Sequence, residues 1–221
     1  MRQLQLQQRH EKAFSRKGRD SVERVLNAAR DLLVQEGYAG LSMRKIAARC
    51  DMTVGNLSYY YVSKTDLMSD LIDAITQGYV GWWDDVMANE SLTPEEQFAT
   101  ILHFIMDDLA TPETTGFFTE LWALANHEEF ARVAMDNVYQ HEYEMLVQMI
   151  GRLNPLILQE DRVILAVYMQ ASMEGHTIFV GHQKKWAKYI KQTANMIVKS
   201  YLHMVQTITH EEIHQLRPSA G

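Results

Sequence analysis

This sequence has a single cysteine, Cys50, among its 221 residues, so no disulfide can form within the chain. Its first residues are polar and basic, without the apolar core of a secretory signal, and no uninterrupted apolar run approaches the roughly 20 residues of a membrane-spanning helix. A Gly-rich phosphate loop and a Gly-x-Ser-x-Gly nucleophile turn are also missing. We therefore expect a cytoplasmic protein that does not cross a membrane, is not an enzyme and uses no cofactor.

Charge is unevenly distributed along the chain. Residues 1–64 contain 12 Lys and Arg against 6 Asp and Glu, whereas residues 65–221 contain 9 against 22. The formal net charge of −7 therefore hides a basic head joined to an acidic body. A basic head of this kind is typical of a segment that meets a polyanion such as DNA.

Helical periodicity predominates, and no strand-like alternation extends beyond a few residues. Gly37 is expected to end the first helix, Ser42 and Thr53 to cap the next two, and Thr93-Pro94 to open a helix of the body. The predicted fold class is all-α, with an N-terminal three-helix head and a larger helical body. We expect about nine helices, at 19–36, 42–49, 53–60, 63–80, 94–110, 112–126, 128–151, 160–182 and 184–208.

The expected helices at 42–49 and 53–60 have the size and spacing of a helix-turn-helix, whose second helix lies in the major groove. Leu57 and Tyr61 can share an inner face with Ile46, which turns the other side chains of the second helix outward. Asn56 suits an adenine edge, Arg44 a guanine or a phosphate, and tyrosine hydroxyls suit phosphate oxygens. The predicted DNA-binding residues are Arg44, Thr53, Val54, Asn56, Ser58, Tyr59, Tyr60 and Lys64.

The stretch LSMRKIAARCDMTVGNLSYYYVSKTDL resembles the DNA-binding head of the TetR family of bacterial transcription regulators, over about residues 19–75. The positions that fall on the family pattern are Ser42, Ile46, Ala47, Thr53, Gly55, Leu57, Tyr60, Ser63, Lys64 and Leu67. Asp51 replaces a glycine in the turn, Ser58 a tyrosine and Tyr61 a core phenylalanine. Asp tolerates a left-handed backbone, so the turn should survive. Tyr59, Tyr60 or both are expected to take over the phosphate contact of the missing tyrosine.

The resemblance implies a ligand-responsive repressor, a homodimer that reads a palindromic operator in the major groove. The expected parts are a flexible basic arm at 1–18, a DNA-binding domain at 19–65 and a ligand-binding and dimerisation domain at 66–221. The helices at about 160–182 and 184–208 would form the dimer interface. A small, largely apolar or aromatic effector would release the DNA. The candidate effector-binding residues, which suit a helical core equally well, are His103, Phe104, Phe118, Trp122, Tyr139, Tyr143, Tyr168, Met169 and Met173. Glu120 is a further polar candidate.

Two other functions compete with this interpretation. The sequence HEEIH at 210–214 matches the H-E-x-x-H pattern of zinc hydrolases, in which His210 and His214 would bind zinc and Glu211 would act as the base. The motif is hydrophilic, lies near the end of the sequence and has no third ligand downstream, so metal binding without catalysis is the better reading, and we expect no dedicated metal site. The second rival is a DNA-binding architectural protein that recruits a protein partner and has no small-molecule inducer.

Overall fold

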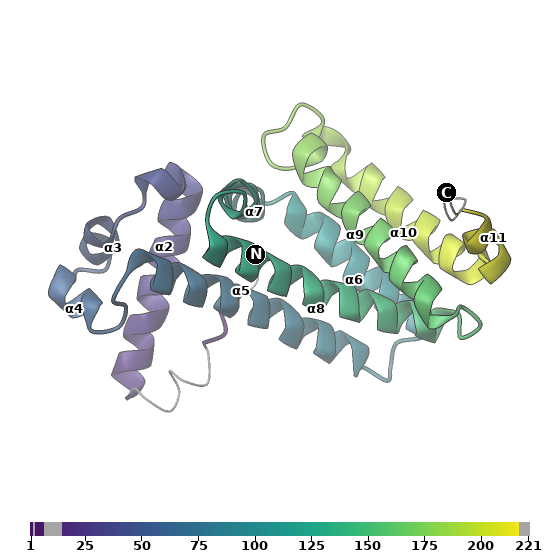
Figure 1. The fold of residues 1–221 in the computed structure, drawn as a ribbon, viewed down its shortest axis with the longest axis horizontal. Helices are drawn as coiled ribbons and strands as arrows, with labels where there is room; N and C mark the ends of the chain where they lie inside the picture. Colours follow the sequence, from purple (N-terminus) through teal and green to yellow (C-terminus); the bar gives the residue numbers. More distant parts are fainter. Residues whose placement is uncertain (2, 7–14, 217–221) are drawn as a thin grey trace. The chain divides into compact units, whose positions relative to one another are not determined.

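The computed structural model describes residues 1, 3–6 and 15–216, and all regular structure in these residues is helical. The predicted all-α fold class is thereby confirmed. The helices (Figure 1) are α2 (Arg16–Gly40), α3 (Met43–Arg49), α4 (Val54–Ser58), α5 (Lys64–Met87), α6 (Pro94–Leu109), α7 (Pro112–Ala125), α8 (Glu129–Leu153), α9 (Gln159–Val180), α10 (Ile190–Thr207) and α11 (His210–Gln215), with a 3-10 turn, η1 (Ala187–Tyr189), before α10.

The sequence prediction missed the last helix and misplaced the start of the one before it. Residues 184–186 form a turn that leads into η1, so the helix expected at 184–208 begins at Ile190. The additional helix α11 is opened by a reciprocal capping box, in which Thr209 Oγ1 accepts the Glu212 N–H and the Glu212 carboxylate accepts the Thr209 N–H. The Thr-x-x-Glu spacing of residues 209–212 is the signal in the sequence that indicates the start of this short helix.

The chain divides into two compact units. Unit 1 comprises Met1–Gly81 and Pro112–Tyr139, and unit 2 comprises Trp82–Thr111 and Gln140–Gly221. Unit 1 therefore holds α2, α3, α4 and α7, and unit 2 holds α6, α9, α10 and α11, while α5 and α8 contribute residues to both. The predicted functional domains, at 19–65 and 66–221, stay a prediction.

The core of unit 1 is organised around α2, which packs against α3 and α7. The apolar stripe expected on this helix is buried, at Val22, Val25, Leu26, Ala29, Leu32 and Leu33. In the stretch predicted to be a flexible arm, Leu4 is buried and the Gln5 N–H donates to the Ala74 carbonyl of α5 at 3.0 Å. Residue 2 and residues 7–14 of that arm lie outside the described part of the chain.

Unit 2 is built on α6, which packs against α9 and α10. Its buried apolar residues include Phe98, Ile101, Leu102 and Met106 of α6, Met169 and Met173 of α9, and Val205 of α10. A hydrogen bond from Asn154 Nδ2 to the Val205 carbonyl, at 2.9 Å, fixes the turn between α8 and α9 against the end of α10. This packing determines which face of α9 stays exposed, and the predicted dimer interface lies on α9.

Candidate nucleic-acid interface

The turn between α3 and α4 is closed by local hydrogen bonds. Ser42 Oγ accepts the Lys45 N–H at 3.3 Å to start α3, and Thr53 Oγ1 accepts the Asn56 N–H at 3.1 Å to start α4. Between them the Met52 N–H donates to the Ala47 carbonyl at 2.9 Å. Asp51 adopts a left-handed backbone with φ 53°, as predicted for the residue that replaces a glycine there. The two helices thus form a helix-turn-helix.

The inner face of this helix-turn-helix is apolar and closed by one buried polar contact. Ile46 and Leu57 are fully buried, and so is Tyr61, whose hydroxyl donates to Asp70 Oδ2 of α5 at 2.5 Å. Cys50 is buried in the turn, where its thiol donates weakly to the Arg24 carbonyl of α2 at 3.6 Å. The prediction that Tyr61 faces the core of the head is confirmed, and Asp70 is the partner that its hydroxyl needed.

The outer face of α4 carries most of the predicted DNA-binding side chains. The exposed ones are Arg44, Thr53, Val54, Asn56, Ser58 and Tyr59. Tyr59 is 73% exposed, whereas Tyr60 is half-buried, and the two rings make an edge-to-face contact with centroids 5.1 Å apart. Exposed hydroxyls and an amide of α4 and its ends, with the guanidinium of Arg44 on α3, are groups that bind phosphate oxygens and base edges. Their contacts with DNA stay predictions.

Lys64, predicted to bind phosphate, is already engaged within unit 1. Its Nζ donates to the carbonyls of Tyr38 and Leu41, at 3.3 and 3.4 Å, and lies 3.6 Å from the centre of the Tyr38 ring. Burial lowers the pKa of the Lys64 amine, and the nearby Glu128 carboxylate opposes that shift. Because carbonyls at a helix C-terminus attract cations, Lys64 fastens the start of α5 to the end of α2. A phosphate contact would have to compete with these interactions.

The end of α2 is also held by α7. Gly37 has φ 70°, a left-handed conformation that favours glycine, and the next N–H, that of Tyr38, donates to Glu120 Oε2 at 2.9 Å. A Cβ on Gly116 would lie only 3.0 Å from Val34 Cγ1, so α7 and α2 approach closely. Glu120 was a candidate to orient a ligand, and the structure gives it a backbone partner instead. Spacing along the sequence gave no signal for this contact, because it joins residues 82 positions apart.

The predicted effector-binding residues lie in both units. In unit 1, Phe118 is buried, and Trp122 Nε1 donates to the Tyr139 hydroxyl at 2.6 Å, so the structure brings these last two together. In unit 2, Met169 and Met173 are fully buried and Tyr168 is about half exposed. The remaining candidates of unit 2 are His103 and Phe104 on α6 and Tyr143 on α8, all half-buried. Their role in binding an effector stays a prediction.

Unit 2 has an apolar surface cavity of about 380 Å³. It is lined by Ile164, Leu165, Tyr168, Met204, Ile208, Ile213 and Leu216. Of the predicted effector-binding residues, Tyr168 is the one that lines it, and its ring makes an edge-to-face contact with that of Tyr201. The cavity was not expected from the sequence, because part of its wall belongs to α11, a helix that was not predicted from the sequence.

A buried carboxyl group lies deeper in unit 2, on α8. Glu142 is almost inaccessible to solvent, and burial raises its pKa to about 7, against a smaller opposing effect of the hydrogen bond with Gln170. Among the residues that the structure describes, Glu142 Oε1 has no hydrogen-bond partner, and the same holds for Thr177 Oγ1 of α9. An ionised carboxylate in such surroundings is unfavourable.

Comparison with known proteins places the helix-turn-helix in a family. Residues 25–71 match the sequence model described as bacterial regulatory proteins, tetR family. An uncharacterized HTH-type transcriptional regulator in the dhlA 5′ region of Xanthobacter autotrophicus is 25% identical over 201 residues, which are 90% of this chain and 91% of that protein. Salmonella enterica GusR has the same fold, with a TM-score of 0.70 at 16% identity over 85% of this chain and 96% of GusR. A TetR transcriptional regulator from Legionella pneumophila gives a TM-score of 0.62 at 19% identity, over 85% and 96% of the two chains.

Proposed function

This chain belongs to the TetR family of DNA-binding transcriptional regulators, and we propose that it is a homodimeric repressor released by a small apolar or aromatic effector. Two heads would read half-sites about one helical turn, roughly 34–36 Å, apart in successive major grooves. An effector in the body would favour a conformation in which the heads no longer fit this spacing. Since such coupling is reciprocal, bound DNA would weaken effector binding by the same factor.

The observation that carries DNA reading is the outer face of α4. Tyr59 is 73% exposed, the largest exposure of any aromatic side chain in or beside α4. Asn56 of α4 and Arg44 of α3 are also exposed and offer amide and guanidinium donors. The excess of basic residues in the first 64 positions adds a favourable field for the phosphate backbone, in contrast to the acidic remainder of the chain.

The exposed apolar face of α9 supports a dimer through α9 and α10. Ile164, Val167, Tyr168 and Ile178 are each 44–57% exposed, and Phe179 is 62% exposed. By length and composition α9 could also cross a membrane, which for a single helix is weak evidence, and a third of its most apolar window is buried within the unit. An exposed apolar stripe on a helix of this kind suits a second copy of the same helix.

The coupling between effector and DNA is proposed to run through the contacts around Tyr38. There α7 holds the end of α2 through Glu120, and Lys64 of α5 holds the same residues from the other side. A movement of α5 or α7 by an effector would therefore shift the base of the helix-turn-helix. Couplings of about 1–3 kcal/mol, which are typical, would change DNA occupancy about 5- to 150-fold.

Selection of bound sequences from a random DNA pool tests the DNA-reading part of the proposal. We expect a palindromic site with half-sites about one turn apart, bound less tightly as salt rises. Tyr59→Phe should then weaken binding about fivefold, the effect of losing one hydrogen bond of about 1 kcal/mol. Tyr60→Phe should cost less, because Tyr60 is half-buried. Tyr189→Phe, at an exposed tyrosine of η1, is the matched control and should leave affinity unchanged.

A pool that yields no enriched motif would contradict the specific regulator. The alternative, an architectural protein that recruits a protein partner, would then be favoured. The surface around Trp186 and Tyr189 supports that alternative. Trp186 and Tyr189 are exposed and stacked with centroids 6.4 Å apart, and Lys185 and Lys188 lie over their rings. An aromatic and basic surface of this type suits an acidic protein partner.

A further inference from the structure

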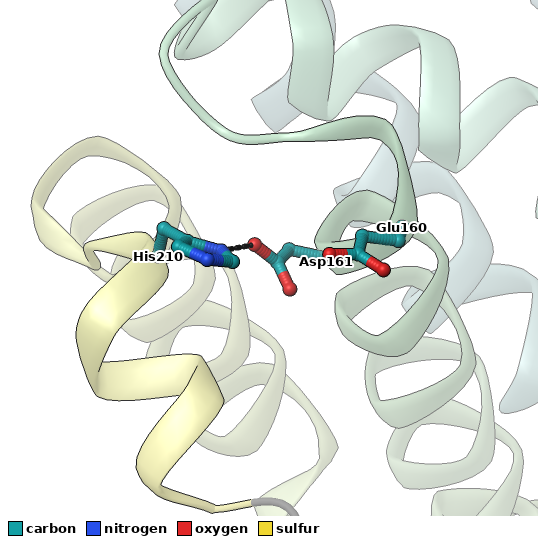
Figure 2. Close-up of side chains that lie close together, drawn as sticks. All are labelled: Glu160, Asp161 and His210. Atoms are coloured by element: carbon teal, nitrogen blue, oxygen red, sulfur yellow. Dashed lines mark hydrogen bonds and ion pairs between the residues drawn. The ribbon is translucent and has the colours of Figure 1, made fainter.

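Three potential metal ligands meet where the start of α9 faces the start of α11. Glu160 and Asp161 lie in the first turn of α9, and His210 is the first residue of α11, 49 positions later than Asp161 (Figure 2). His210 Nδ1 lies 2.5 Å from Asp161 Oδ2. One ligand atom from each of the three side chains lies within 4.8 Å of the other two. Side chains from two separate helices thus converge on one point.

The three side chains differ in how far they are exposed to solvent, and this difference suits a bound cation. Asp161 is fully buried, the His210 side chain is 40% exposed and Glu160 is exposed. Two neighbouring carboxylates, one of them buried, make bound positive charge at this point favourable. Solvent can deliver an ion past His210 and Glu160, while Asp161 holds it from below. The site is therefore open on one side and anchored on the other.

The geometry needs little adjustment to accept a metal ion. Oxygen and nitrogen ligands lie about 2.0–2.2 Å from zinc, so two ligands of one ion are at most about 4.4 Å apart. Side-chain rotations would bring the most widely separated of the three atoms, now within 4.8 Å, closer together and widen the 2.5 Å separation of His210 Nδ1 and Asp161 Oδ2 to admit the ion. The ion would replace the hydrogen bond between Asp161 and His210, and any proton on the ligating nitrogen of His210 would pass to solvent. Two carboxylates and one imidazole suit a divalent first-row transition metal.

The second histidine of the HEEIH sequence, His214, lies beside His210 but outside the cluster of three. The rings of His210 and His214 lie one helical turn apart, with centroids at 6.0 Å. Glu212 of the same sequence is occupied by the capping box with Thr209, and Glu211 is exposed at the surface. The arrangement offers ligands without a buried cleft for a substrate, so it suits metal binding better than hydrolysis.

We infer that Glu160, Asp161 and His210 form a binding site for a divalent transition metal ion of the zinc class, which fastens α11 to α9. Ile213 and Leu216 lie on or just after α11, and together with Ile164 and Leu165 of α9 they line the apolar cavity of unit 2. Fastening α11 therefore fixes one wall of that cavity. This site lies beyond the proposed DNA-reading and effector functions and does not depend on either.

A simple ion pair between His210 and Asp161 is the competing account of the same contact. It would hold α11 without any metal, and it would not need Glu160. Glu160→Gln separates the two accounts, because it removes a metal ligand while leaving the His210–Asp161 contact in place. Glu211→Gln removes the same charge from an exposed position of α11 and is the matched control.

The experiment uses the full chain without an affinity tag, stripped with EDTA and then titrated with Co²⁺ and Zn²⁺. We expect one ion per chain, a visible Co²⁺ spectrum typical of mixed oxygen and nitrogen ligation, and a higher melting temperature with Zn²⁺. Affinity should fall at least about tenfold in Glu160→Gln and further in His210→Ala, with no change in Glu211→Gln. Absence of stoichiometric binding, or equal affinity in Glu160→Gln and the intact chain, would overturn the inference. Because Glu160 is exposed, this variant should fold even if replacements of Asp161 do not.

Discussion

Replacing Glu142 by glutamine should change how the stability of the protein depends on pH. Glu142 is buried on α8, and burial raises its pKa from 4.5 to about 7. In the unfolded chain the carboxyl group titrates near its ordinary value. Between these two values the folded protein holds a proton that the unfolded chain has lost, so folding becomes less favourable as pH rises. Glutamine is nearly isosteric, carries no charge and can still pair with Gln170.

The size of the effect follows from the pKa difference. A shift from 4.5 to about 7, at 1.36 kcal/mol for each pKa unit, corresponds to about 3 kcal/mol. The stabilisation of the neutral carboxyl group is fully present below about pH 4.5 and is lost as pH rises through about 7. Above that pH the intact protein should be about 3 kcal/mol less stable, relative to the glutamine variant, than it is in acid.

Urea unfolding of both proteins, followed by circular dichroism at one protein concentration, measures this difference across the pH range. Other titrating groups are common to both proteins and cancel when the two free energies of unfolding are subtracted. Glu144→Gln, at an exposed position on the same helix, controls for the loss of one carboxyl group outside the core. A Glu142→Gln difference that is flat across the range would refute the reasoning, and so would one that favours the intact protein at high pH.

Three further outcomes follow from the contacts described. Tyr61→Phe removes the hydroxyl that donates to buried Asp70, so the free energy of unfolding measured in urea should fall by about 1–3 kcal/mol, and an unchanged value would contradict that bond. Gly37→Ala places a side chain at φ 70°, with its Cβ 3.2 Å from Glu120 Oε2, and should cost about 1–2 kcal/mol in the same assay, whereas alanine at exposed Gly55 should meet less resistance. Val167→Glu charges the exposed stripe of α9, so sedimentation should detect monomers if that face joins two copies, while a persisting dimer would place the interface elsewhere.

The sequence predicted the helix-turn-helix in detail because local chemistry determines most of it. Ser42 and Thr53 cap the helices that their positions indicated, and Asp51 takes the left-handed turn. Tyr61 is buried, as its four-residue spacing from Leu57 implied. Each of these features depends on residues close together in the chain, so periodicity and capping rules are sufficient to find them.

Contacts between distant residues escaped the same rules. Lys64 was assigned to phosphate from its place at a helix start, but the carbonyls that it meets lie 23 and 26 positions earlier. The meeting of Asp161 and His210 could not be read from either local segment. Methionine and aromatic spacing also could not separate pocket from core, because both require apolar residues on one helical face. Met169 and Met173 are fully buried, and Tyr168 lines a cavity whose other wall was unforeseen.

Because the single cysteine is buried, its rate of alkylation measures how often the helix-turn-helix opens. Burial raises the pKa of the Cys50 thiol, so an alkylating reagent finds little thiolate while the turn between α3 and α4 is closed. Reaction must then wait for a local fluctuation that lifts the turn away from α2, and the rate measures how often this happens. With no second thiol in the sequence, every labelled molecule records that event. Operator DNA would hold the two short helices in place and so slow the alkylation of Cys50. The alkylation rate therefore offers a way to follow DNA binding without attaching a probe.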